Sequence, residues 1–351
     1  MTEIFPLFSF KEALRLADDA RTKKHILLGN GFSQGADDKF KYGSLYLQAK
    51  RNGLPKQVEA LFDRYGTTNF EEVLRHLHEG HWLARHYQLT KSNPKLDMEK
   101  DYEKVKDALV NAIATAHPSS RAAVPEPKLI ACAGFLAQFN NVFTTNYDLL
   151  LYWASLAKPP ILFKDGFWKK DENPNYLVFD TVPKSLETNE RFIYFLHGAL
   201  HISTAGGDVR KFVWGKENPP LIDQIREALS DDRFPLVVSE GDPEQKKERI
   251  ESSSYLSACR DNFQKIHGSL FIFGSQLGTE DTHILRWIAG NRGLDRLFVG
   301  IFGDPDASDK QEMISRIQKQ VDERKVSFYD SSSADVWTVP HPREEAQAIK
   351  S

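Results

Sequence analysis

The chain has 351 residues, of which 46 are Lys or Arg and 49 are Asp or Glu, so its formal net charge is −3. A charge so near zero gives no global field for polyanions, and we expect no strong direct nucleic-acid binding. Two cysteines, Cys132 and Cys259, can build neither a disulfide framework nor a four-cysteine zinc site. The sequence shows no signal-peptide pattern and no run of 18 apolar residues, so we expect a cytoplasmic protein that does not enter the membrane.

Short apolar runs that end in Gly, Asn or Asp recur along the chain, as buried parallel strands do where they lead into loops. The first predicted strand covers 25–29 and the second 142–145, with helices over 127–138 and from Asp148 onward. Further strands are predicted at 177–179, 192–196, 236–238, 270–273 and 297–302. This repetition predicts an α/β fold with a Rossmann-like, doubly wound parallel sheet, whose ligands bind at the carboxyl ends of the strands.

Two blocks interrupt the rhythm of strands. Residues 44–118 space apolar residues three and four apart, which predicts a helical insertion, and residues 199–266 are polar, which predicts an insertion or flap. Within the second block, the run KKERIESSS at 246–254 is interpreted as a solvated helix. Residues 1–351 are therefore expected to form one domain with two additions and no zinc module.

Four short segments that could carry chemistry each follow a predicted strand: GNGFS at 29–33, TTNYD at 144–148, HG at 197–198 and GSQL at 274–277. A glycine-rich turn after a strand lets backbone N–H groups approach a pyrophosphate, although such a turn also occurs without a ligand. Similarly, an Asn before an Asp can cap a helix, and a lone His after an apolar strand can be a core residue.

In this order the four segments resemble the sirtuin superfamily, and within it the divergent, mainly bacterial, zinc-free branch whose known members destroy NAD in antiphage defence. The resemblance implies NAD as substrate and Asn146 and His197 as catalytic residues. The residues that it implies for NAD binding are Gly29, Asn30, Gly31, Phe32, Ser33, Thr145, Asp148, Gly274, Ser275 and Asp281.

The activity implied by this resemblance is an NAD hydrolase that cleaves the nicotinamide–ribose bond and releases nicotinamide and ADP-ribose, depleting NAD in defence. Such an enzyme needs control, and the resemblance implies a homo-oligomer or a hexameric ATPase partner of the HerA type. One alternative is a protein deacylase or ADP-ribosyltransferase with the same first step, against which the missing zinc module argues. Another is a non-catalytic nucleotide-sensing or scaffold subunit, against which Asn146 and His197 argue.

Histidines cluster in the first helical block, but their spacing does not predict a metal site. Among His76, His78, His81 and His86, the run HEGH at 78–81 is one residue short of the HExxH zinc pattern. We therefore expect no metal in folding or catalysis.

Overall fold

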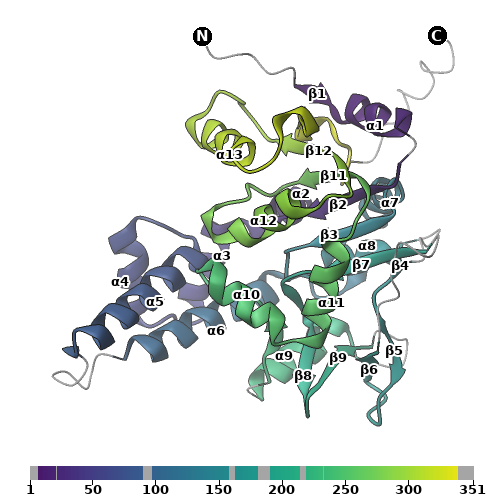
Figure 1. Cartoon of the computed structure of the whole chain (residues 1–351). Coiled ribbons are helices and arrows are strands. Elements are labelled where there is room, and N and C mark those ends of the chain that lie inside the picture. Colours follow the sequence, from purple (N-terminus) through teal and green to yellow (C-terminus); the bar gives the residue numbers. More distant parts are fainter. Residues whose placement is uncertain are drawn as a thin grey trace.

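The computed structural model describes residues 7–20, 22–89, 97–157, 163–180, 190–213, 219–231 and 233–338, which build an α/β fold on two sheets (Figure 1). The larger sheet has eight strands, and every neighbouring pair is parallel. Across the sheet the strands are β1 (Phe8–Ser9), β13 (Val326–Asp330), β12 (Leu294–Ile301), β11 (Gly268–Phe273), β2 (Lys24–Leu28), β3 (Asn141–Thr144), β7 (Arg191–Phe195) and β4 (Phe163–Lys164).

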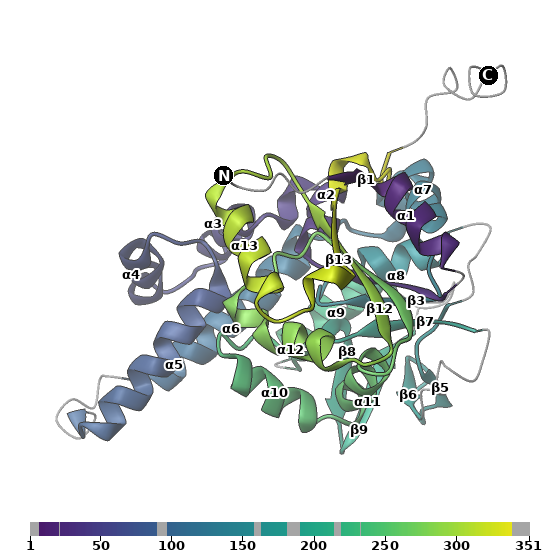
Figure 2. The same ribbon diagram turned by 45° about the horizontal axis from the view of Figure 1, so that its top comes forward.

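Helices cover both faces of this sheet. On one face the ring of Phe10 contacts Phe271 of β11 at 6.0 Å, and on the other Phe263 contacts Phe143 of β3 at 4.9 Å between ring centroids. Figure 2 shows α1, α7 and α8 on one side and α12 and α13 on the other. The covering helices are α1 (Phe10–Asp19), α7 (Glu126–Leu136), α8 (Leu150–Ser155), α11 (Ser254–Phe263), α12 (Thr282–Gly290) and α13 (Ser308–Gln318). The predicted α/β fold with a doubly wound parallel sheet is therefore confirmed.

The smaller sheet is antiparallel and was not predicted. Its order is β10 (Pro235–Val237), β8 (Gly198–Ala205), β9 (Asp208–Phe212), β6 (Tyr176–Phe179) and β5 (Phe167–Lys170). The expectation that the apolar runs at 177–179 and 236–238 belong to the parallel sheet is wrong, because they are β6 and β10 of this second sheet. A three-residue apolar run indicates burial but carries no information about strand direction.

The two interrupting blocks contain helices and strands. Within them, residues 90–96, 214–218 and 232 are not among the residues that the structure describes. In the first block, α3 (Tyr42–Arg51), α4 (Lys56–Tyr65), α5 (Phe70–His86) and α6 (Met98–Ala116) project from the sheet (Figures 1 and 2). The second block contributes β8, β9 and β10 to the antiparallel sheet and adds α9 (Leu221–Ser230), α10 (Pro243–Glu251) and α11.

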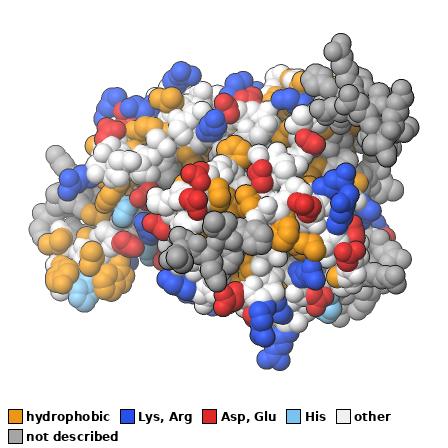
Figure 3. All heavy atoms as spheres, turned by 90° about the horizontal axis from the view of Figure 1, so that it is seen from above, with side chains coloured by type: hydrophobic (Ala, Val, Ile, Leu, Met, Phe, Trp, Pro, Cys, Tyr) orange, Lys and Arg blue, Asp and Glu red, His pale blue; other side chains and the backbone are white. Residues whose placement is uncertain are grey.

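The surface mixes charges of both signs. Lys and Arg side chains lie among Asp and Glu side chains over the face drawn in Figure 3. Apolar side chains gather at the tip of the helical projection, where Trp82, Leu83 and Tyr87 of the α5 end are exposed. Among the described residues, no helix is both long and apolar enough to span a bilayer.

Candidate functional site

A large cavity lies where the winding of the parallel sheet reverses. From β2 the chain proceeds through β3 and β7 towards one edge, whereas β11, β12 and β13 proceed towards the other edge. In doubly wound sheets ligands bind at this switch point, outside the carboxyl ends of the strands. A cavity of about 850 Å³ opens there, within the range of about 300–1,000 Å³ that is usual for small-molecule and cofactor sites.

Ten of the residues expected in the site line this cavity, and they come from four separate segments that follow strands of the parallel sheet. They are Gly29, Asn30, Gly31, Thr145, Asn146, Asp148, His197, Gly274, Ser275 and Asp281. The side chains of Phe32 and Ser33 do not line it, because both are fully buried in helix α2 (Asn30–Ala36), which begins directly after Gly29. Phe32 packs against Trp337 with ring centroids 4.9 Å apart, and Ser33 donates to the carboxylate of Asp148.

The glycine turn after β2 is joined to the end of β11 by backbone contacts. Gly29 N–H donates to the carbonyl of Phe273 at 2.9 Å, and Gly31 N–H donates to the carbonyl of Gly274 at 2.8 Å. A Cβ atom on Gly31 would come within 2.7 Å of the Gly274 Cα atom. The two loops can therefore approach this closely only with glycine at the contact.

Replacing Gly274 by alanine is expected to destabilise the fold by about 2 kcal/mol or more. Gly274 has φ +69°, in the left-handed region, and an added Cβ would lie 2.6 Å from the backbone nitrogen of Phe32. The matched control is Gly43→Ala in α3, where no atom lies within 4 Å of the added Cβ, and alanine there is expected to be neutral or stabilising by up to about 1 kcal/mol. Urea unfolding of both variants measures the difference, and equal stabilities would contradict the prediction.

Asn146 follows β3, and its amide orientation is fixed by its partners. Its Nδ2 group donates to the carbonyl oxygen of Gly29 at 3.0 Å and to the Ser33 hydroxyl at 2.8 Å. A carbonyl oxygen only accepts hydrogen bonds, so the NH₂ side of the amide must face it. The Asn146 carbonyl oxygen is therefore the atom of this side chain that is available to a ligand.

Asp148 is tied into the same network. Its carboxylate accepts hydrogen bonds from the Ser33 hydroxyl and from the backbone N–H of Leu150, the latter at 2.8 Å. Burial raises the pKa of Asp148 in spite of these two bonds. The network links the loop after β2 to the loop after β3 and fixes both walls of the cavity.

His197 lies where the chain leaves the parallel sheet for the antiparallel one. Gly198 takes φ +75°, and a Cβ there would come within 1.8 Å of the Leu236 carbonyl oxygen, so the turn after His197 requires glycine. The imidazole is buried, and its Nε2 lies 2.9 Å from Nε2 of His283. Burial lowers the pKa of His197 well below its usual range and that of His283 to about 4, so both rings are neutral near pH 7.

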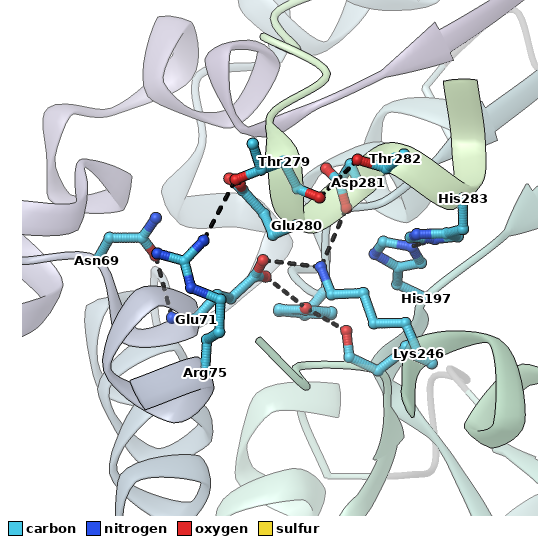
Figure 4. Close-up of polar contacts among 12 residues, drawn as sticks. Asn69, Glu71, Arg75, His197, Lys246, Thr279, Glu280, Asp281, Thr282 and His283 are labelled. Carbon is cyan, nitrogen blue, oxygen red and sulfur yellow. Dashed lines mark hydrogen bonds and ion pairs between the residues drawn. The ribbon is translucent and has the colours of Figure 1, made fainter. Parts of the chain in front are cut away.

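A buried ion triad closes the wall of the cavity beside His197 (Figure 4). The ammonium of Lys246 in α10 lies 2.8 Å from the carboxylate of Glu71 in α5 and 3.0 Å from that of Asp281 in the short helix η4 (Thr279–Asp281). Lys246 is fully buried, which corrects the interpretation of its segment as a solvated helix. The triad joins both interrupting blocks to the switch point.

The triad distributes charge unequally among its members. Burial opposes the charge on Lys246, but the carboxylates of Asp281 and Glu71 outweigh it and raise the Lys246 pKa. Burial likewise opposes the charge on Asp281, yet Lys246 holds the Asp281 pKa below its usual range. For Glu71 burial prevails over the attraction of Lys246, and the pKa rises to about 7.

One protein-family model matches nearly the whole chain, including the segments that form the cavity. The DUF4917 family, described as a domain of unknown function, matches residues 26–337, which include every loop of the cavity named above. The chain belongs to this family. No curated protein matches the sequence.

Solved structures align with this DUF4917 chain, and one of them does so over most of its length. It comes from work titled "Structural Basis for the Mechanism and Regulation of Sir2 Enzymes", and the alignment covers 97% of this chain and 99% of that one. The identity is 12% and the TM-score 0.36. A match with this TM-score carries no argument about function.

One group of side chains in the DUF4917 chain has the spacing of a metal site. Ligand atoms of His197, Asp281 and His283 lie within 4.8 Å of one another. However, the ammonium of Lys246 already forms an ion pair with the Asp281 carboxylate, at 3.0 Å. A cation there would be repelled by this buried positive charge, so we keep the expectation that no metal takes part.

Glu71 and Lys246 are among the residues of the DUF4917 site that were not found from the sequence. Glu71 follows the cap residue Asn69, whose side chain accepts from the Glu71 N–H at 3.0 Å, so the sequence pattern is that of a helix start. In α10 the buried residues are Lys246 and Ile250, four positions apart on one face. The sequence could have indicated the burial of Lys246, because it lies on the same face of a short helix as the apolar Ile250.

Proposed function

We propose that this protein is an NAD hydrolase that cleaves the bond between nicotinamide and ribose. The observation that carries the proposal is the convergence of the glycine turn, Asn146 and His197 on one cavity at the switch point of the sheet. This is the place where doubly wound folds bind nucleotides. The sirtuin-like motifs of the sequence supply the same three elements in the same order.

The cavity has two ends that suit the two halves of NAD. Asn146, Asp148 and His197 line the cavity beyond β3 and β7, on one side of the switch point, which we call the nicotinamide end. On the other side, beyond β12 and β13, the lining includes Phe302 and Trp337, whose flat rings suit an adenine base. The pyrophosphate then lies against the glycine turn between the two ends, where backbone can approach it closely.

Cleavage of this bond needs little nucleophilic push, because the pyridinium is already a cationic leaving group. The electron pair of the broken bond leaves with nicotinamide, and positive charge develops on the ribose. The site must hold the ribose in place and stabilise that charge with groups that are already oriented. The fixed carbonyl oxygen of Asn146 and the neutral imidazole of His197 suit these tasks as acceptors for ribose hydroxyls or water.

An enzyme that destroys NAD must be restrained in its host, so we extend the proposal to antiphage defence under external control. The control is a homo-oligomer or a partner of the HerA ATPase type. The sirtuin-like resemblance supports this part. With a net charge of −3, this chain has little attraction for nucleic acid, which agrees with nucleic acid being bound by a partner and not by this chain.

The test is incubation of the purified protein with NAD, alone and with candidate partners, followed by chromatography of the products. We expect nicotinamide and ADP-ribose in equal amounts. Transfer of ADP-ribose to a protein acceptor would favour the transferase alternative. Binding of NAD without release of nicotinamide under every condition would favour a nucleotide-sensing subunit.

A further inference from the structure

Glu71 brings a carboxylate into the cavity from outside the parallel sheet. It lies in the first turn of α5 and lines the cavity together with Asn146, Tyr147 and His197. Figure 4 shows its side chain directed from α5 towards Lys246 and η4. The first helical block therefore supplies a reactive group to the site that none of the four sequence motifs contains.

The two carboxyl oxygens of Glu71 differ in their hydrogen-bond partners. Oε2 accepts from the ammonium of Lys246 at 2.8 Å, and Oε1 lies 3.2 Å from the hydroxyl oxygen of Tyr147. That hydroxyl also lies 2.7 Å from the carbonyl oxygen of Val238. A hydroxyl has one proton to donate, so Tyr147 donates it in the shorter contact, to the carbonyl oxygen of Val238. Oε1 is therefore the oxygen free to exchange a proton with another group.

The other acids and bases of the nicotinamide end are less suited to take a proton. Both oxygens of Asp148 accept hydrogen bonds, from the Ser33 hydroxyl and the Leu150 N–H. Asp281 is held in its charged form by Lys246, which lowers its pKa. His197 is a weak base because burial lowers its pKa well below the usual range of a histidine.

We propose that Glu71 is a catalytic residue of this site: its carboxylate binds the attacking water at the nicotinamide end and accepts a proton from it. In this step the water oxygen bonds to C1′ of the nicotinamide ribose as the C1′–N1 bond breaks, and the electron pair of that bond leaves with nicotinamide. The proton on Glu71 then passes to solvent, so the products are nicotinamide, ADP-ribose and one proton. This role rests on the NAD cleavage proposed above and names water as the acceptor.

The surroundings of Glu71 suit a base that works near neutral pH. Burial raises its pKa to about 7, and a general base is most effective when its pKa is near the working pH. The titratable groups that face it from the packed elements are Lys246 of α10, Glu280 and Asp281 of η4, Tyr42 of α3 and Tyr147 after β3. The cleavage rate is therefore expected to rise with pH through about 7 as Glu71 loses its proton.

The decisive variants are Glu71→Gln and Glu71→Ala. Gln retains a carbonyl oxygen for Lys246 but cannot take up a proton, so hydrolysis is expected to fall about 100-fold or more and to lose its rise with pH. Azide is a nucleophile that needs no deprotonation. In Glu71→Ala it is expected to restore nicotinamide release and to yield ADP-ribosyl azide. The control is Glu79→Gln, an exposed residue of the same helix, which is expected to retain the wild-type rate and pH profile.

The outcomes separate this role from the proposed function itself. Wild-type protein that releases no nicotinamide, either alone or with candidate partners, would contradict NAD cleavage, and the role of Glu71 with it. Active wild-type protein together with a fully active Glu71→Gln variant would overturn the role of Glu71 alone. So would a Glu71→Ala variant that binds NAD with wild-type affinity but forms no azide adduct.

Discussion

Replacing either Asn146 or His197 by alanine is expected to lower NAD cleavage by about 100-fold or more. The amide of Asn146 is locked by Gly29 and Ser33, so its free oxygen has one direction in which to act. His197 is held just as firmly, between the turn at Gly198 and the imidazole of His283. Such preorganised groups contribute about 10²–10⁴-fold to catalysis in enzymes.

The double variant is expected to lose far less than the product of the two single losses, because the two side chains act on the same ribose. His86→Ala, at the exposed end of α5, is the control for the loss of a histidine and is expected to leave the rate unchanged. Nicotinamide release measures activity, and circular dichroism with thermal unfolding checks that each variant folds. Near-wild-type turnover in either single variant would contradict the assigned roles.

The strands that build the switch point were predictable because their signal is local. An apolar run followed by Gly, Asn or His can be recognised from a few consecutive residues. Five of the predicted runs are strands of the parallel sheet, namely β2, β3, β7, β11 and β12. Parallel strands place their carboxyl ends on one edge, so Asn146 and His197 were expected to meet there. In the structure both line the same cavity.

Glu71 and Lys246 escaped prediction because their roles depend on contacts between distant segments. The first turn of α5 is rich in acidic residues, as exposed helix starts are, and Glu71 is buried only through the packing of distant segments against it, among them α10 and the loop after β3. The second sheet escaped for a related reason. Its strands β8 and β9 include exposed polar residues, and their partners are identified only by pairing across the fold.

Lys246→Met is expected to destabilise the protein by about 3–5 kcal/mol near pH 8, the usual cost of removing one partner from a buried ion pair. Methionine fills a similar volume, but it leaves the buried carboxylate of Glu71 and the partly buried carboxylate of Asp281 without their ammonium. The control is the neighbouring, exposed Lys247→Met, for which a change within about 0.5 kcal/mol is expected.

The loss caused by Lys246→Met should also depend on pH, and the sign follows from the two carboxyl groups. In the wild type, Lys246 keeps the Asp281 pKa below its unfolded value, so Asp281 contributes stability at neutral pH that is lost as the pH falls. In the variant both carboxyl pKa values rise above their unfolded values, so its stability falls as the pH rises. The difference between wild type and variant should therefore be large at pH 8 and smaller at pH 5. Urea unfolding at the two pH values measures it, and an equal loss at both would mean that Lys246 stabilises the fold through its packing and not through its charge.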